Sequence, residues 1–317
     1  MQESTAQVTV LVPINDTKYL FTTLESIEAQ TLLKSQFEVL LVADRIPNEL
    51  IKAVAQNFSF TFDVVEAPSA GIVSALNYGI DLVKTEYIAR MDADDLMLPH
   101  RLDTQLREFE RNPKLVGLGG GMIPFRNDEK ELREVYFPKS SLILRRIIPY
   151  KNLFAHPTMM LKTSAIREVG MYRNTKSEDW DLWSRLIEVG EMTNLKSPLI
   201  KYRLHEHQIS NMSPTIEPEV STLIQLSKWM RKRNLKDFPV VAETSNQWLS
   251  ELQKDQRSMR KVNKLLHTQV RRVAAQKVLA LKGLNSRTYK LKRIYFAAKE
   301  SPTEVLLTLM QRLFKFL

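Results

Sequence analysis

The chain has 317 residues, no cysteine and a hydrophobic content of 44%, which is ordinary for a folded protein. Without cysteine, neither a disulfide framework nor a thiolate metal site can form. The polar N-terminal stretch MQESTAQ is not expected to act as a signal peptide, and no apolar run reaches the ~18 residues of a membrane-spanning helix.

The charge is distributed unevenly along the chain. Residues 1–219 contain 25 Lys and Arg against 30 Asp and Glu, a net charge of −5, whereas residues 220–317 contain 21 against 6, a net charge of +15. This asymmetry predicts an anionic partner for the C-terminal region. The proline-containing stretch MSPTIEPE (212–219) predicts a linker, so we expect domains at 1–215 and 216–317.

The first 111 residues alternate between strand-like and helix-like patterns. Apolar runs predict strands at 8–12, 37–44, 60–67 and 87–91. Helical spacing predicts helices that follow Asp16, Pro47, Gly71 and Pro99, with Asp16 as a cap of the first and Pro47 in the first turn of the second. Four strand–helix units predict parallel strands joined by right-handed crossovers, and ligands bind such sheets beyond the carboxyl ends of the strands.

Two segments beyond residue 112 have interpretable patterns. GLGGG (117–121) predicts a flexible connection, because it matches neither GxGxxG nor GxxxxGK. EDWDLWSRLIEVG (178–190) predicts a helix with Gly190 as its C-cap.

Three carboxylates follow the fourth predicted strand, at Asp92, Asp94 and Asp95. The spacing of Asp92 and Asp94 would allow both to reach one divalent cation, since Mg²⁺ and Mn²⁺ prefer oxygen ligands. The alternative is that Asp94 or Asp95 caps the helix that begins near Pro99.

Two further clusters could carry chemistry. An acidic residue such as Asp179, in the aromatic setting of EDWDLWSR, can be tuned as a general base, and Trp180 could stack on a sugar. The alternative is a helix start with the tryptophans in the core. His205 and His207 could reach a metal, but two histidines make no zinc site without two more ligands.

Six segments between residues 7 and 210 occur in the order and spacing of a known family: VTVLVPINDTKYLFTTLESIEAQT, FEVLLVADR, AGIVSALNYGI, EYIARMDADDLMLPHRLDTQ, FAHPTMML and SEDWDLWSRL. Together they resemble the family-2 glycosyltransferases, especially bacterial enzymes of surface-polysaccharide synthesis. The resemblance implies an α/β GT-A (nucleotide-diphospho-sugar transferase) fold, with a mostly parallel sheet flanked by helices. It implies a nucleotide-binding half at about 1–115 and an acceptor half at about 116–215, and leaves a basic, helical region at 216–317.

The resemblance also implies a role for each matching residue. Asp179 would be the catalytic base. Asp94, Asp92 and His205 would hold Mn²⁺ or Mg²⁺. Donor-binding residues would be Pro13, Ile14, Asn15, Asp44, Asp92, Ala93 and Asp94, and acceptor-binding residues would be His156, Glu178 and Trp180. The family often has an aromatic residue directly after the first strand, where this chain has Asn15 and Asp16.

The function implied is an inverting transfer of a sugar from a nucleotide-diphosphate donor, expected to be a UDP-sugar. The acceptor would be a hydroxyl of a glycan or lipid-diphosphate-linked saccharide in capsule or O-antigen synthesis. Two alternatives remain at this point. One is a sugar-nucleotide nucleotidyltransferase. The other is a non-enzymatic nucleic-acid-binding protein that uses the basic region.

The basic C-terminal region has two interpretations. Its cations and the apolar segment PTEVLLTLMQRLFKFL (302–317) could contact an anionic membrane surface. This predicts a cytoplasmic protein that is peripheral on the inner face of the plasma membrane. Alternatively, the region forms a helical layer packed on the catalytic domain, with Lys and Arg on its solvated face.

Overall fold

The fold comes from a computed structural model, which describes residues 6–126, 130–149, 151–175 and 177–204. The chain divides into two units, and most of the described residues belong to the first, which comprises residues 1–146, 153–173 and 178–208. The predicted linker at 212–219, the basic region, His205 and His207 lie outside the described residues. Within the described part, no helix combines the length and the apolar character needed to cross a bilayer.

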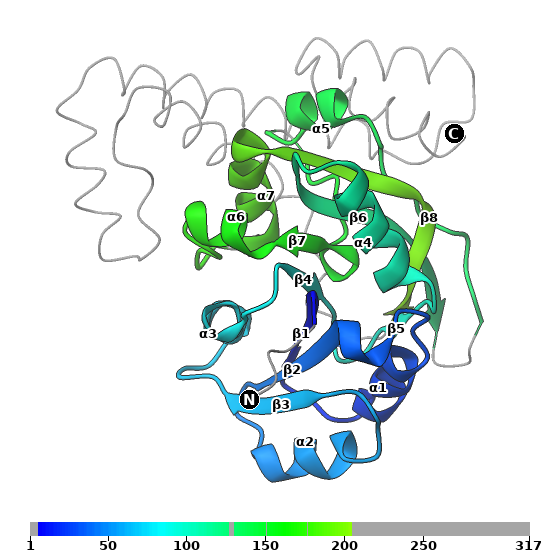
Figure 1. The fold of residues 1–317 in the computed structure, drawn as a ribbon, viewed down its shortest axis with the longest axis vertical. Coiled ribbons are helices and arrows are strands. Elements are labelled where there is room, and N and C mark those ends of the chain that lie inside the picture. The colour runs from blue at the N-terminus through cyan, green and yellow to red at the C-terminus, as the bar shows by residue number, and fades with distance from the viewer. Residues whose placement is uncertain (1–5, 127–129, 150, 176, 205–317) are drawn as a thin grey trace, which may run out of the picture. The chain divides into compact units, whose positions relative to one another are not determined.

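Among the described residues, eight strands form one sheet (Figure 1). They are β1 (Val8–Ile14), β2 (Phe37–Ala43), β3 (Phe62–Glu66), β4 (Tyr87–Arg90), β5 (Leu96–Met97), β6 (Leu115–Arg126), β7 (Met160–Lys162) and β8 (Glu191–Leu204). Their order across the sheet is β3-β2-β1-β4-β7-β6-β8-β5. The segment β3-β2-β1-β4 is parallel throughout, which confirms the four predicted strands and their direction.

The second half of the sheet was not predicted from the sequence. β7 runs antiparallel to both β4 and β6, β8 is parallel to β6, and β5 is antiparallel to β8. The helices are α1 (Leu20–Glu28), α2 (Asn48–Ala55), α3 (Ile72–Leu82), α4 (Arg101–Arg111), α5 (Ser141–Ile147), α6 (Thr163–Glu168) and α7 (Glu178–Val189), with short 3₁₀ turns at Lys34–Gln36 and His156–Thr158.

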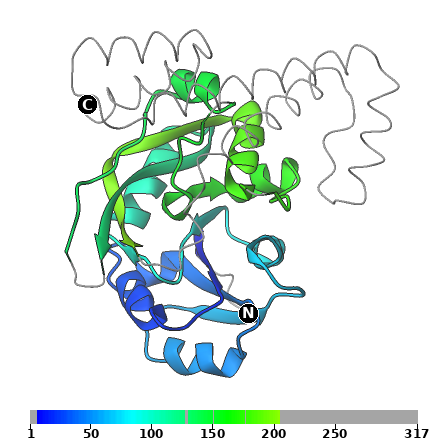
Figure 2. The same ribbon diagram turned by 180° about the vertical axis from the view of Figure 1, so that it is seen from behind.

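The first strand is apolar on both faces because helices cover both sides of it. Alternate residues Val8, Val10, Val12 and Ile14 belong to the main core cluster, which contains buried residues of α1, α2 and α4. Leu11 points the other way and reaches Gly79 of α3. The two views show α1 and α3 on opposite sides of these strands (Figure 1 and Figure 2).

The helix starts differ from the sequence prediction in how they are capped. Asp16 does not cap α1, which begins at Leu20; its side chain accepts a hydrogen bond from the Lys18 N–H at 2.9 Å instead. Pro47 is the residue directly before α2. Neither Asp94 nor Asp95 caps α4, whose N-cap residue is His100 and has no side-chain cap. The capping alternative for the acidic cluster is therefore wrong.

The prediction of a flexible connection at 117–121 is also wrong, because these residues lie inside β6 and are buried. Their glycines serve close packing. A Cβ on Gly119 would lie 2.5 Å from Asn194 Oδ1 and 2.8 Å from Met159 Sδ. Asn194 cannot easily give way, because its amide donates to the carbonyl oxygens of Pro138 and Leu153.

Gly119→Ala should therefore lower the free energy of unfolding by about 1–3 kcal/mol, the usual cost of overpacking a core. Gly117→Ala, two residues away on the same strand, is the matched control. Its Cβ would meet the terminal methyl of Met192 at 2.8 Å, which can rotate away. Urea denaturation of both variants measures the difference, and equal losses would contradict the packing role of Gly119.

Candidate active site

The carboxyl ends of β1, β2 and β4 meet at one edge of the sheet. The Asp44 N–H donates to Ile14 O at 2.7 Å, and the Met91 N–H donates to Leu11 O at 3.0 Å. These bonds continue the strand pairing up to the residues predicted to bind the donor. Pro13 and Ile14 are buried there, whereas Asn15 is exposed.

Asp44 is buried at this edge and connects two elements. Its Oδ2 accepts the Gly71 N–H at 3.0 Å, and its Oδ1 accepts from the exposed Arg45 Nε at 3.3 Å. Gly71 has φ +108° and directly precedes α3, a conformation that favours glycine. The carboxylate thus holds the end of β2 against the start of α3.

The three carboxylates after β4 form one cluster. Asp92, Asp94 and Asp95 each offer an oxygen, and these oxygens lie within 4.8 Å of one another. Asp95 is fully buried: its Oδ1 accepts the Arg203 N–H at 2.8 Å, whereas its Oδ2 has no hydrogen-bond partner among the described residues. Burial raises the pKa of Asp95 well above its usual range, and the charges of Asp92 and Asp94 raise it further. A hard cation fits this set of oxygen donors, since it would offset the repulsion between them.

Two buried arginines supply part of the positive charge beside the cluster. Arg90 forms an ion pair with Asp92, and Arg101 donates to Arg90 O at 2.7 Å. Burial, together with the charge of Arg90, lowers the pKa of Arg101 to about 9. Neither arginine was predicted from the sequence to belong to the site, although Arg90 and Asp92 are only two residues apart.

Helix α1 holds the backbone of the acidic segment. The buried Thr23 hydroxyl donates to the carbonyl oxygens of Ala93 at 2.8 Å and Asp95 at 2.9 Å. The Met97 N–H donates to Ser26 Oγ at 2.9 Å. The turn that carries Asp94 is therefore anchored from outside its own strand.

On the other side of the site, His156 lies between two polar groups. Its Nε2 is 2.7 Å from the Tyr172 hydroxyl, and its Nδ1 is 3.9 Å from Glu178 Oε1. Burial lowers the pKa of His156 well below 6.5, and the charge of Arg90 lowers it further. The imidazole is therefore neutral near pH 7. Tyr172, which was not predicted from the sequence, is fixed through its backbone by two 2.9 Å hydrogen bonds with the Asn77 side chain.

The predicted catalytic base lies at the start of α7. Asp179 is half-buried, and its Oδ1 accepts the Trp180 N–H at 2.7 Å. Burial raises the pKa of the neighbouring Glu178 to about 6, with further contributions from Asp179 and Asp92 and opposition from Arg90. The charge of Asp92 thus acts on Glu178, so the end of β4 and the start of α7 lie near each other.

Trp180 does not reach a surface on which a sugar could stack. Its side chain is 0% exposed, which agrees with the core alternative left open by the sequence.

Arg185, on the same helix, holds the preceding loop: it pairs with Asp181 at 2.7 Å and donates to the carbonyl oxygens of Val169 and Met171. Met171 has φ +54°, so these bonds hold a backbone conformation that non-glycine residues seldom adopt.

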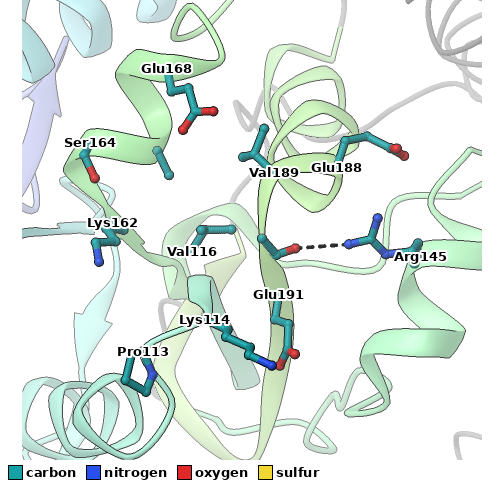
Figure 3. A pocket seen from close by; sticks show the side chains of 12 residues that line it. Pro113, Lys114, Val116, Arg145, Lys162, Ser164, Glu168, Glu188, Val189 and Glu191 are labelled. Carbon is teal, nitrogen blue, oxygen red and sulfur yellow. Dashed lines mark hydrogen bonds between the residues drawn. The ribbon is translucent and has the colours of Figure 1, made fainter. Parts of the chain in front are cut away.

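A cavity of about 500 Å³ lies elsewhere on the first unit (Figure 3). It lies between the starts of β6 and β8 and the end of β7. At that end, Lys162 pairs with Tyr87, the first residue of β4. This is the sheet edge opposite to the acidic cluster. Its charged lining residues are Lys114, Arg145, Lys162, Glu168, Glu188 and Glu191. The cavity is therefore separate from the candidate active site.

Comparison with known sequences gives a consistent result. The glycosyl transferase family 2 profile matches residues 9–170. The chain is 31% identical over 230 residues to the O-antigen biosynthesis glycosyltransferase WbnJ of Escherichia coli, covering 70% of this chain and 87% of that one. It is 32% identical over 185 residues to the amylovoran biosynthesis glycosyltransferase AmsE of Erwinia amylovora, covering 57% of this chain and 68% of that one.

Solved structures are similar in fold. TarS residues 1–349 of S. aureus, in complex with UDP-GlcNAc, has a TM-score of 0.57 at 15% identity, covering 94% of this chain and 88% of that one. The mannosyltransferase PcManGT of Pyrobaculum calidifontis, in complex with GDP-Man and Mn²⁺, has a TM-score of 0.52 at 13% identity, covering 97% and 84%. At these identities the likeness concerns the fold alone.

Because the pKa of Glu178 is raised in the folded state, we expect the free energy of unfolding to depend on pH through this residue. A carboxyl with a pKa raised from 4.5 to about 6 stabilises the folded state below pH 4.5, and this contribution is lost as the pH rises through 6. Glu178→Gln should therefore become more stable relative to the wild type between pH 4.5 and 7, by up to about 2 kcal/mol. Urea denaturation across this range measures the difference.

Glu188→Gln, which changes an exposed glutamate on the same helix, controls for the altered net charge. If both variants show the same dependence on pH, burial of the Glu178 carboxyl has no energetic cost and the prediction is wrong.

Proposed function

The chain belongs to glycosyl transferase family 2 and has the GT-A fold, and we propose that it transfers a sugar, with inversion, from a UDP-sugar to a hydroxyl of a saccharide. The observation that supports this proposal is the cluster of Asp92, Asp94 and Asp95 oxygens within 4.8 Å of one another at the end of β4, with Glu178 of α7 near enough for the charge of Asp92 to act on it. Membership of this family leaves no support for the nucleotidyltransferase and nucleic-acid-binding alternatives.

The acceptor proposed is a glycan or lipid-linked saccharide of a surface polysaccharide, since two relatives are O-antigen and amylovoran biosynthesis enzymes. We also propose that the basic residues 220–317 contact the anionic inner face of the plasma membrane, where a lipid-linked acceptor would be presented. That region lies outside the described residues.

The nucleoside would bind at the ends of β1 and β2. Pro13, Ile14 and Asn15 would form one wall. The buried Asp44 carboxylate accepts one N–H from Gly71 and retains further acceptor capacity. It would accept a ring N–H of the donor base, and we propose uracil as that base because the fold neighbour TarS is solved in complex with UDP-GlcNAc.

The diphosphate would bind next to the acidic cluster, with Ala93 beside it and Mn²⁺ or Mg²⁺ held by Asp94 and Asp92. Asp92 also pairs with Arg90, so Asp94 is the principal ligand proposed. The bound cation would offset the negative charge that grows on the leaving diphosphate. His205 remains a predicted ligand outside the described residues.

Asp179 would accept the proton of the attacking hydroxyl, because it lies at the start of α7 on the acceptor side of the site. Positioned acid–base catalysis of this kind contributes typically about 10²–10⁴-fold. A single displacement at the anomeric carbon would invert its configuration. His156, as the neutral imidazole, and Glu178 would orient the acceptor. The buried Trp180 keeps only a packing role.

Asp94→Ala should lose the donor binding that depends on metal. The wild type should be stabilised in thermal unfolding by UDP with Mn²⁺ more than by UDP in EDTA, and more than by GDP or dTDP with Mn²⁺. In Asp94→Ala the effect of Mn²⁺ should disappear because the principal ligand is gone. Asp103→Ala, which removes a carboxylate that pairs with Arg107 on α4, is the control. A full Mn²⁺ effect in Asp94→Ala would remove Asp94 from the cation site.

Asp179→Asn should reduce transfer by about 10²–10⁴-fold while UDP affinity stays unchanged, because the base acts only on the acceptor. Release of UDP from a panel of UDP-sugars, with water as the acceptor, provides the activity measurement, and calorimetry provides the affinity. Glu188→Gln controls for a changed charge on α7. If UDP affinity falls as far as the rate does, Asp179 is a donor-binding residue and the assignment as base is wrong.

A further inference from the structure

Arg203 contacts both aspartates of the turn after β4. It is the second-last residue of β8 and is 8% exposed. Its backbone N–H donates to Asp95 Oδ1 at 2.8 Å, and its side-chain Nε donates to Asp94 O at 2.8 Å. The side chain of one residue, more than 100 positions away in sequence, therefore holds the peptide group of the proposed principal ligand.

The Arg203 guanidinium is itself held between two aromatic rings. Its central carbon lies 4.2 Å from the centroid of Tyr19 and 4.5 Å from that of Phe125. A planar guanidinium suits stacking of this kind, and an ammonium does not reproduce it. Tyr19 precedes α1 and Phe125 lies on β6, so the stack joins three separate elements behind the acidic turn.

We propose that Arg203 is a positioning residue, which sets the backbone of the Asp94–Asp95 turn and thereby the affinity of the site for a divalent cation. The inference rests on the proposed function, since the cation site is part of that proposal. The Asp94 carbonyl is fixed by Arg203, so the direction of the Asp94 side chain depends on the stacked guanidinium. Loss of such indirect contacts typically weakens metal binding by about 10–100-fold.

The charge of Arg203 makes the test decisive, because two hypotheses predict changes of opposite sign. If Arg203 acted only as a nearby positive charge, it would repel a second cation, and its removal would strengthen Mn²⁺ binding. If it positions the turn, removal weakens Mn²⁺ binding. Its backbone N–H, which donates to Asp95 Oδ1, is retained in the methionine and lysine variants, so the experiment isolates the side chain.

The experiment measures Mn²⁺ binding to the full chain by calorimetry, with Mn²⁺ alone and with Mn²⁺ plus UDP. Arg203→Met and Arg203→Lys should both weaken binding of Mn²⁺ alone by about 10-fold or more, because neither side chain can stack and donate as arginine does. Lys201→Met removes a cation two residues earlier on β8, one that pairs with Glu131 at 2.6 Å, and should leave the affinity unchanged.

A second pair of variants leaves Arg203 in place. Tyr19→Leu removes one face of the stack and should weaken Mn²⁺ binding in the same direction, whereas Tyr19→Phe keeps the ring and should behave as the wild type. Melting temperatures in EDTA show whether each variant folds. A purely structural role would lower these temperatures while the Mn²⁺ affinity and the rise in melting temperature on adding Mn²⁺ stayed as in the wild type.

The outcomes separate this inference from the proposed function. If the wild type binds Mn²⁺ and the Arg203 variants bind it equally well or more tightly, the positioning role is wrong and the cation site stands. If Arg203→Lys keeps wild-type affinity while Arg203→Met weakens binding, an ammonium suffices to hold the turn, and the role proposed for the stacked guanidinium is wrong. If the wild type binds no Mn²⁺, with or without UDP, the proposed cation site and the role of Arg203 are both wrong.

Discussion

Repulsion among three buried or half-buried carboxylates is the constraint around which the site is built. Oxygens of Asp92, Asp94 and Asp95 lie within 4.8 Å of one another. Burial raises the pKa of Asp95, and the charges of Asp92 and Asp94 raise it further. Such a cluster is costly to ionise without positive charge close by. Arg90 and Arg101 supply some of this positive charge from inside the protein. A divalent cation that binds together with the donor diphosphate would supply the rest.

The elements around the cluster act as supports for a turn that would not hold this geometry alone. From α1, the Thr23 hydroxyl donates to the carbonyl oxygens of Ala93 and Asp95 in this turn. From β8, the Arg203 side chain donates to the carbonyl oxygen of Asp94. The antiparallel half of the sheet thus has a role beyond closing the fold, since it brings β8 to the strand ends of the parallel half. The same half carries His156, whose Nδ1 lies 3.9 Å from Glu178 Oε1 of α7.

The local patterns of the sequence predicted the parallel half well, because helical and strand periodicities depend only on neighbouring residues. They also located the acidic residues, since the end of a strand predicts the binding edge of a parallel sheet. The glycines of 117–121 misled the prediction. Glycine marks flexibility in an open segment and close packing in a buried strand, and only Asn194 and Met159 beside Gly119 distinguish the two.

The sequence by itself determined the family, the four strand–helix units and the carboxylates that carry the proposed chemistry. The tertiary structure decided what each of these groups contacts. It paired Asp92 with Arg90, placed Arg203 behind Asp94, joined His156 to Tyr172 and buried Trp180 in the core. The physical reason is that charge compensation and stacking depend on distances between elements far apart in the chain, which no local pattern encodes.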